Sequence, residues 1–191
     1  MAGKKKVGIL ALQGAFKEHQ EIFKKLNCNT ILIRKKEQLN ELDGLIIPGG
    51  ESTTIIKLMT EYKFIDEIKS MANKGMGIWG TCAGLIILAS EIANSNQESL
   101  KLIDIKVERN AFGRQIDSFE NDLLISKLGD KPFPAVFIRA PWIIEANKDV
   151  EILAEYKGKA VLAKQNKILV SSFHPELTDD LRLHEYFINS L

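Results

Sequence analysis

The chain has 191 residues, which fits one domain with a single core, and we expect residues 1–191 to form that domain. Its 26 basic and 25 acidic residues nearly cancel, so no overall field attracts nucleic acid or an anionic membrane. No apolar run approaches the ~20 residues that span a bilayer, and two cysteines are too few for a disulfide framework, which favours a cytoplasmic protein.

The first half of the chain alternates apolar runs with amphipathic segments. Apolar residues recur at helical spacing after the run at 7–12 and again after the run at 45–47. These patterns predict helices, and Gly75 is expected to end the second one. Either Ser52 or Thr53 is expected to cap a helix after the third run. This alternation predicts a three-layer α/β sandwich, with a mostly parallel sheet and helices on both faces. The expected strands are 7–12, 30–33, 45–47 and a fourth that leads into Cys82; the expected helices are 16–26 and 64–72.

After about residue 100 the strands follow one another more closely. Short apolar runs are separated by turn-forming sequences such as Lys157-Gly158-Lys159 and Gln165-Asn166, which favours an antiparallel extension of the sheet over a second domain. Residues 94–100 are interpreted as a polar loop or a frayed helix end, and 110–115 as irregular chain. The expected strands are 102–107, 136–138, 152–156, 160–163 and 168–173, followed by a closing helix at 181–191.

The sequence Gly80-Thr81-Cys82-Ala83-Gly84 has the form of a nucleophile elbow, a tight strand-to-helix turn that exposes a reactive side chain. Bulky residues would clash in such a turn, which explains the two glycines. The helix that begins after Cys82 directs its free N–H groups at the sulfur and favours a thiolate. A buried structural cysteine is the alternative interpretation.

A base for that nucleophile is available in Phe173-His174-Pro175-Glu176, just beyond an expected strand. An imidazole can take and return a proton near neutral pH, and a carboxylate can fix its tautomer. Because proline restricts the backbone, Glu176 can curl back towards His174. The remaining histidines, His19 and His184, are interpreted as surface or core residues, and Cys28 as an inert small apolar residue.

Two further stretches resemble parts of a binding site. In Pro48-Gly49-Gly50-Glu51-Ser52, two glycines leave backbone N–H groups accessible, as an oxyanion hole requires, although an ordinary turn is equally compatible. Arg109 and Arg139 each lie beside a strand end, where a guanidinium can clamp a carboxylate or be a surface charge.

Together these motifs carry a family resemblance. The sequences G-T-C-A-G at 80–84 and F-H-P-E at 173–176 resemble class I glutamine amidotransferase domains. Five further matches narrow the resemblance to the family of glutaminase subunits of pyridoxal 5′-phosphate synthase. They are L-A-L-Q-G at 10–14, P-G-G-E-S-T-T at 48–54, R-N-A-F-G-R-Q at 109–115, F-I-R-A-P at 137–141 and F-H-P-E-L-T at 173–178.

The resemblance implies roles for individual residues and a reaction without metal or cofactor. Cys82 would be the nucleophile of a reaction that hydrolyses L-glutamine to L-glutamate and ammonia, His174 the acid and base, and Glu176 its orienting partner. The oxyanion hole would use N–H groups near Gly50 and Ala83, and Gln13 and Gly14 are candidates for a partner interface. The glutamine site would comprise Gly50, Glu51, Ser52, Arg109, Ile138 and Arg139.

The resemblance also implies a partner. In this family, ammonia passes to a separate (β/α)₈ synthase subunit in a hetero-oligomer, and that subunit makes pyridoxal phosphate for vitamin B6 biosynthesis.

Three other functions remain open at this point. They are a glutaminase that serves another synthase, a cysteine peptidase with the same elbow, and a non-enzymatic binding module.

Overall fold

The computed structural model describes residues 5–109 and 118–191, so the irregular chain expected at 110–115 lies outside the described residues. A mixed sheet crosses the molecule, and five adjacent strands are parallel, in the order β2-β1-β3-β4-β12. Continuous runs of β-branched and apolar residues form the middle strands because both faces of the sheet are covered. The five strands are β1 (Lys6–Leu10), β2 (Asn29–Ile33), β3 (Gly44–Ile47), β4 (Gly77–Thr81) and β12 (Ile168–Ser171).

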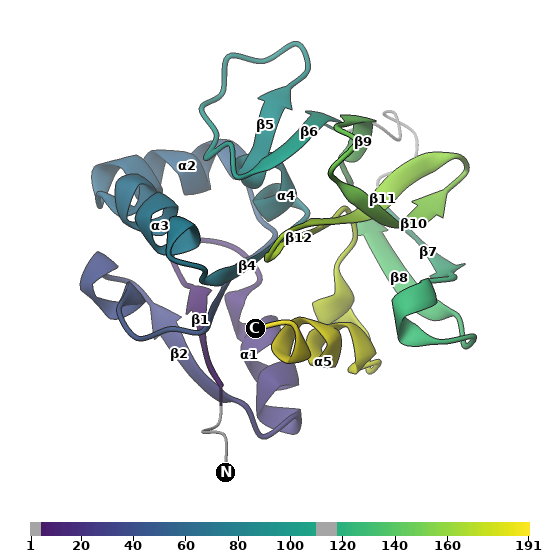
Figure 1. The fold of residues 1–191 in the computed structure, drawn as a ribbon, viewed down its shortest axis with the longest axis horizontal. Helices are drawn as coiled ribbons and strands as arrows, with labels where there is room; N and C mark the ends of the chain where they lie inside the picture. The colour runs from purple at the N-terminus through teal and green to yellow at the C-terminus, as the bar shows by residue number, and fades with distance from the viewer. Residues whose placement is uncertain (1–4, 110–117) are drawn as a thin grey trace.

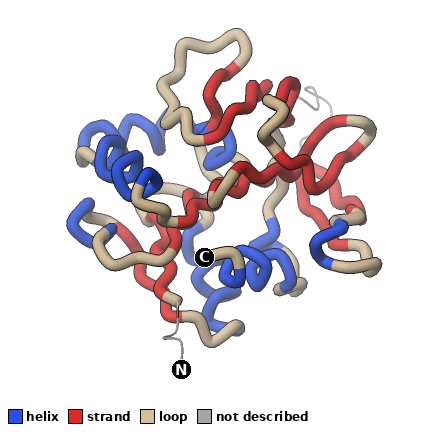
Figure 2. Tube along the Cα trace, viewed as in Figure 1, coloured by secondary structure: helices blue, strands red, loops and turns tan. Residues whose placement is uncertain are grey.

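Helices pack on both faces of this sheet, as Figures 1 and 2 show. Successive residues of a strand point to opposite faces of the sheet and join different apolar clusters. In β3, Leu45 and Ile47 belong to one cluster and Ile46 belongs to the other. The three-layer arrangement predicted from the sequence is therefore confirmed. The first face carries α2 (Ser52–Glu61), α3 (Phe64–Asn73) and α4 (Ala83–Leu88); the second carries α1 (Phe16–Lys25) and α5 (Arg182–Asn189).

Beyond β12 the sheet continues mainly with antiparallel strands, which confirms the predicted extension. Strand β10 pairs with β11 outside the main path, and β7 and β8 form a separate two-stranded sheet. The sequence patterns did not predict β5, β7 and β9. The bounds are β5 (Ala89–Ile92), β6 (Ile103–Glu108), β7 (Ser118–Leu123), β8 (Phe133–Ile138), β9 (Trp142–Ala146), β10 (Glu151–Tyr156) and β11 (Lys159–Gln165), with short 3₁₀ helices η1 (Lys36–Leu39), η2 (Ser126–Leu128) and η3 (Pro175–Leu177).

Three local predictions need correction. Neither Ser52 nor Thr53 caps α2, because Glu51 precedes the helix and the Ser52 hydroxyl donates instead to Gln97 Oε1 at 3.0 Å. Strand β1 ends at Leu10 and β12 at Ser171, two residues earlier than expected in each case, since the chain turns there to form site loops. Residues 95–100 form a loop, so the frayed-helix alternative is wrong.

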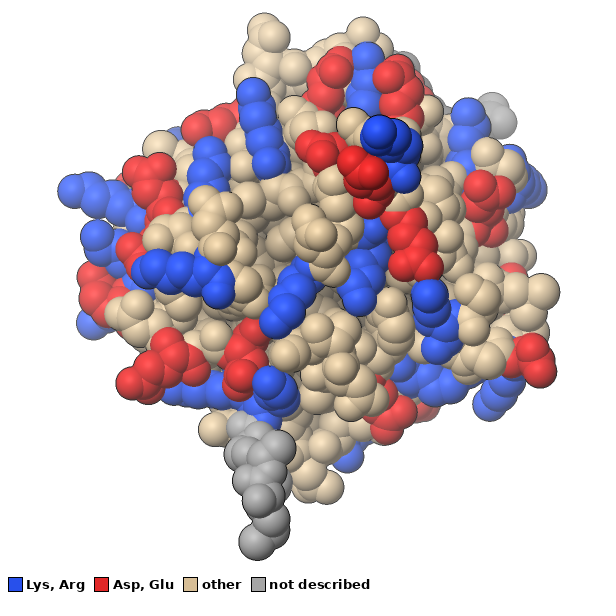
Figure 3. Space-filling view, in the orientation of Figure 1, with Lys and Arg blue, Asp and Glu red and all other residues tan. Residues whose placement is uncertain are grey.

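The surface agrees with the balanced composition. In Figure 3, Lys and Arg side chains are interspersed with Asp and Glu over the face that is drawn. Within residues 5–109 and 118–191, no helix is long and apolar enough to cross a membrane.

Candidate active site

The site lies at the carboxyl edge of the parallel strands. The segments that leave β1, β3, β4 and β12 begin at this edge, and they carry Gln13-Gly14, Gly49-Gly50, Cys82 and His174 respectively. Carboxyl ends of parallel strands meet at one edge of a sheet, which is where open α/β sheets bind ligands. The topology thus brings together residues that are up to 161 positions apart in the sequence.

Cys82 occupies the turn between β4 and α4 with φ 49° and ψ −100°, a strained conformation for a non-glycine residue. Its N–H donates to the carbonyl of Ser171 at 2.8 Å, and its own carbonyl accepts from the N–H of Leu85 at 3.1 Å. A Cβ on Gly84 would overlap the carbonyl oxygen of Ile47. The prediction that this elbow requires glycine is therefore confirmed at Gly84.

His174 and Glu176 meet across Pro175, as the sequence predicts. Oε1 of the Glu176 carboxylate lies 2.7 Å from His174 Nδ1, and the N–H of His174 donates to Val136 O at 2.8 Å. Both side chains are nearly buried. Burial raises the pKa of Glu176, but the nearby His19 and His174 rings lower that pKa by a larger amount. The net shift is therefore downward, and the carboxylate stays ionised.

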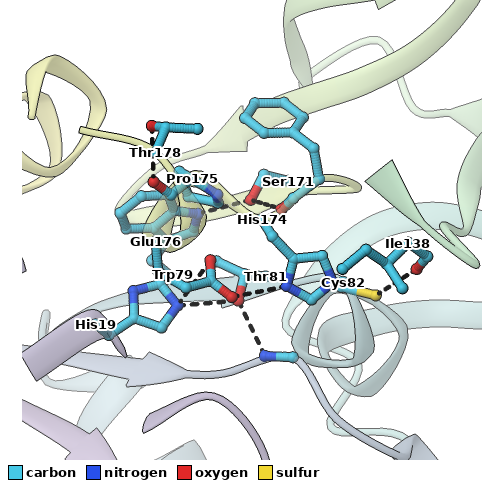
Figure 4. A network of polar contacts seen from close by, with 12 residues as sticks. His19, Trp79, Thr81, Cys82, Ile138, Ser171, His174, Pro175, Glu176 and Thr178 are labelled. Atoms are coloured by element: carbon cyan, nitrogen blue, oxygen red, sulfur yellow. Dashed lines mark hydrogen bonds and ion pairs between the residues drawn. The ribbon is translucent and has the colours of Figure 1, made fainter. Parts of the chain in front are cut away.

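The imidazole of His174 also interacts with Cys82. Burial lowers the pKa of His174, whereas its contacts with Cys82 and Glu176 raise it more strongly, to about 10. An imidazole between a sulfur and a carboxylate can exchange a proton with the sulfur while the carboxylate orients the ring. Figure 4 shows the Cys82 side chain at the end of the ring opposite Glu176, with Sγ 3.8 Å from the carbonyl oxygen of Ile138.

Cys82 and His174 line a cavity of about 340 Å³. Every residue predicted for the nucleophile, the base, the oxyanion hole and the glutamine site lines it, whereas the orienting carboxylate of Glu176 lies behind His174. Ile86 also lines the cavity and was not predicted. The lining residues are Gly50, Glu51, Ser52, Cys82, Ala83, Ile86, Arg109, Ile138, Arg139 and His174.

One wall of the cavity is a polar network centred on Arg109. Its guanidinium lies 3.2 Å from Glu51 Oε1 and donates to Gln97 Oε1 at 3.1 Å. The Ser52 hydroxyl donates to that same Gln97 oxygen. Gln97 was not predicted from the sequence because nothing in the local polar loop signals that this loop reaches Ser52, 45 residues away.

Gly50 also lines the cavity, and the Gly49-Gly50 turn contacts Gln13 and Gly14. Gln13 Oε1 accepts the N–H of Glu51 at 2.8 Å, and the carbonyl of Gly49 accepts the N–H of Ala15 at 2.9 Å. Gly14 has φ +104°, and a Cβ there would overlap the carbonyl oxygen of Gly49. Glycine is thus required at 14 both by its conformation and by the close approach.

Behind the site lie the two histidines that were interpreted as surface or core residues. Both His19 and His184 are fully buried, and His19 contacts Glu176 and Thr81. Their contacts cross between α1, α5 and β4, so no sequence spacing could reveal them. No group of three His, Cys, Asp or Glu residues arranged to hold a metal ion occurs in the part of the chain that the structure describes.

Comparison with known proteins agrees with this geometry. The model of the SNO glutamine amidotransferase family matches residues 9–191. The chain is 53% identical over 186 residues to the pyridoxal 5′-phosphate synthase subunit PdxT of Carboxydothermus hydrogenoformans, covering 97% of each chain. It is 50% identical over 183 residues to the protein of the same name from Thermotoga neapolitana, covering 96% of this chain and 97% of the other.

Two solved structures are also similar. A crystal structure of a glutamine amidotransferase superposes with a TM-score of 0.92 at 50% identity, covering 96% of this chain and 97% of the other. The structure of PurLQS from Thermotoga maritima gives a TM-score of 0.71 at 14% identity, over 98% of this chain and 99% of the other, and therefore shows the fold alone. On the family match and these relatives, the chain belongs to the SNO glutamine amidotransferase family.

Proposed function

We propose that this chain is the glutaminase subunit of a pyridoxal 5′-phosphate synthase and that it supplies ammonia for vitamin B6 biosynthesis. The observation that carries the chemistry is the line Cys82–His174–Glu176 at one end of a cavity with an Arg109–Glu51 wall. We take residues 1–191 to work as one domain in the cytoplasm. The names of the relatives, at about half identity over nearly their whole length, support the choice of pathway.

The reaction begins with attack of the Cys82 thiolate on the side-chain amide carbon of L-glutamine. The resulting oxyanion is held by the backbone N–H groups of Gly50 and Ala83, which border the cavity beside Cys82. His174, protonated at neutral pH, gives its proton to the leaving nitrogen, and ammonia departs. The product of this step is a γ-glutamyl thioester on Cys82.

Hydrolysis reverses the proton path. Neutral His174 takes a proton from water, the hydroxide adds to the thioester carbon, and glutamate leaves as the thiolate and imidazolium are restored. Glu176 stays ionised throughout and holds the His174 Nδ1 proton, so that Nε2 remains the working nitrogen. No metal or cofactor enters either step.

The polar walls fit the rest of the substrate. We assign the α-carboxylate and α-ammonium of glutamine to the wall built from Glu51, Ser52, Arg109, Ile138 and Arg139. A carboxylate and a guanidinium on the same wall offer one partner for each charge of a free amino acid. A peptide substrate would lack one or both of these charges, which argues against the peptidase alternative.

The partner would dock over the carboxyl edge of the sheet, near Gln13 and Gly14. These two residues contact the Gly49-Gly50 turn, so a subunit seated there would touch the oxyanion-hole loop directly. In the family resemblance the partner is a (β/α)₈ synthase subunit in a hetero-oligomer. Ammonia released beneath it would be enclosed rather than lost to solvent.

The test is glutamate release from L-glutamine, measured with and without a synthase subunit, and followed by formation of pyridoxal phosphate from a pentose phosphate and a triose phosphate. We expect glutamate release with L-glutamine and none with L-asparagine or with a glutaminyl peptide. Glutamate release without pyridoxal phosphate formation would assign the chain to another synthase. Binding of glutamine without turnover would establish the non-enzymatic alternative instead.

A further inference from the structure

A chain of buried polar contacts continues past Glu176, on the side away from Cys82. His19 Nε2 lies 3.4 Å from Glu176 Oε2, and the described structure shows no well-formed hydrogen bond to that oxygen. The same nitrogen lies 3.2 Å from Thr81 Oγ1, and His19 Nδ1 lies 3.0 Å from His184 Nε2. All four side chains are buried.

Thr81 connects this chain to the oxyanion-hole loop. Its Oγ1 accepts the backbone N–H of Gly49 at 3.0 Å, in the turn that precedes Gly50. His19 therefore faces two parts of the site at once: the carboxylate that orients His174, and the hydroxyl that holds the Gly49 peptide. Figure 4 shows the His19 ring on the side of the Glu176 carboxylate opposite His174.

The contacts fix the tautomer of His19. If the His19 proton is on Nε2, this N–H points to the Glu176 carboxylate and to Thr81 Oγ1. His184 Nε2–H then donates to the unprotonated Nδ1 of His19. In the other tautomer a bare Nε2 would face the carboxylate, and His184 would carry its proton on Nδ1, which has no partner among the described residues. A buried N–H without a partner is more costly than a buried lone pair, so the first arrangement is favoured.

The surroundings keep both rings neutral. The His184 ring contacts the rings of Trp79 and Phe23, with centroids 4.9 and 5.1 Å away. Burial lowers the pKa of His19 and, well below its usual range, that of His184. The titratable groups that face His19 are Glu176 and His174 from the loop after β12, His184 from α5 and, from its own helix, Glu18.

We propose that His19 is a positioning residue of the glutaminase. Neutral His19, held in one tautomer by His184, presents its Nε2–H to the Glu176 carboxylate and, through Thr81, links that carboxylate to the Gly49-Gly50 turn. Glu176 is thereby kept ionised and turned with Oε1 towards His174. Because one ring touches both parts, the triad and the oxyanion hole are aligned together. This inference rests on the proposed function.

The test uses two pairs of variants in the complex with the synthase subunit. The amide nitrogen of glutamine can reach the position of His Nε2, whereas that of asparagine reaches only Nδ1. His19→Gln keeps a donor near Glu176, and His19→Asn loses it. Thr81→Ser keeps the hydroxyl that holds Gly49, and Thr81→Val loses it at nearly constant shape.

We expect His19→Asn to lower kcat for glutamate release by about tenfold to a hundredfold, by analogy with the groups that orient metal-ligating side chains, with KM changed less than about twofold. The acid limb of kcat/KM should move to higher pH, because Glu176 becomes easier to protonate without its donor. His19→Gln should recover most of the rate and the wild-type limb. Thr81→Val should lose about tenfold in kcat, and Thr81→Ser should stay near wild type.

Each result decides the matter. If His19→Asn and His19→Gln match wild type, or lose activity equally without moving the acid limb, His19 has only a packing role and the proposal is overturned. If His19→Asn does not fold, the Thr81 pair tests the link, and equal rates for Thr81→Val and Thr81→Ser overturn it. Absence of glutamate release from the wild-type complex would instead refute the proposed function itself.

Discussion

The Glu51 backbone N–H donates a 2.8 Å hydrogen bond to the side-chain oxygen of Gln13, 38 residues earlier in the chain. This bond joins the loop after β1 to the loop after β3, because β1 and β3 are parallel neighbours in the sheet. It holds one end of the Gly49-Gly50 turn, whose peptide groups border Cys82. The proposed oxyanion hole is therefore held, at Glu51, by a residue that lies on the expected docking surface.

The isolated chain is expected to be a poor glutaminase that the synthase subunit activates. Glycine peptides reorient at little cost, so the free Gly49-Gly50 turn can favour a conformation in which the hole is misdirected. A competent state populated at about 1–10% would give an activation of about tenfold to a hundredfold on docking. Steady-state glutamate release at saturating glutamine, with and without the partner, measures this. Equal turnover in both samples would mean that the hole is preformed.

Replacing Gly14 by alanine should disturb this turn directly. The new Cβ would overlap the carbonyl of Gly49 at a φ of +104°, and strain plus overpacking should cost about 2–4 kcal/mol of unfolding free energy. Glutamate release should fall more than about tenfold, since the oxyanion loop is displaced.

Gly75→Ala is the matched control for this variant. Gly75 also has a positive φ, +95°, but apart from its chain neighbours no atom of the described residues lies within 4 Å of the position that a Cβ would take, so only strain is added. We expect a loss of about 1 kcal/mol in urea unfolding and wild-type glutaminase activity. Equal loss of activity in both variants would show that Gly14 acts through stability alone.

Substitution of Glu176 by glutamine keeps the shape and removes the charge. The Glu176 carboxylate helps to raise the pKa of His174, so the imidazolium should be less stable in the variant. By analogy with other triads, kcat should fall by between about tenfold and 10⁴-fold. The measurement is kcat across pH 5–10, chosen to span the shifted value of His174. Activity equal to wild type throughout that range would remove Glu176 from the proposed triad.

The buried histidines predict how stability depends on pH. The folded-state pKa values of His19 and His184 are depressed by burial, so the unfolded chain binds more protons below pH 6.5, and stability falls as the pH drops. Each ring contributes at most about 1.4 kcal/mol per pH unit. His174 has the opposite sign: its stabilising contribution is complete below pH 6.5 and is lost as the pH rises towards about 10.

Urea unfolding from pH 5 to 10 should therefore show greatest stability near pH 6.5. The lowered pKa of Glu176 adds a further loss only below about pH 4.5, its ordinary value. His184→Gln should reduce the acid-side slope by about half, because one of two depressed histidines is removed. An unchanged slope in that variant would show that His184 is not protonated on unfolding in this range.

The sequence predicted the parallel half of the sheet well because its strands are buried on both faces and are continuous apolar runs. Strands β5, β7 and β9 were missed. Strand β7, Ser-Phe-Glu-Asn-Asp-Leu, is mostly polar because only one side of it is covered, and β9 begins directly after Pro141. Their pairing comes from distant partners rather than from local pattern.

The residues of the candidate site likewise fall into those that the sequence predicted and those that it did not. Cys82, His174 and the glycines stand in short motifs whose local geometry constrains the residue types, so they could be found by inspection. His19 and Gln97 reach the site only through tertiary contacts, and each sits in a segment with an ordinary helical or loop pattern. A single sequence holds no local signal for such residues.

The central claim is that Cys82 is the nucleophile of a glutaminase. It is tested most directly by glutamate release from L-glutamine by the complex with the synthase subunit, comparing wild type, Cys82→Ala and the control Cys28→Ala. Cys28 is partly exposed and lies near the backbone of Lys5, away from the cavity. Wild type and Cys28→Ala should release glutamate at the same rate, and Cys82→Ala should release none while still supporting pyridoxal phosphate formation from added ammonium. Glutamate release by a correctly folded Cys82→Ala complex would contradict the account.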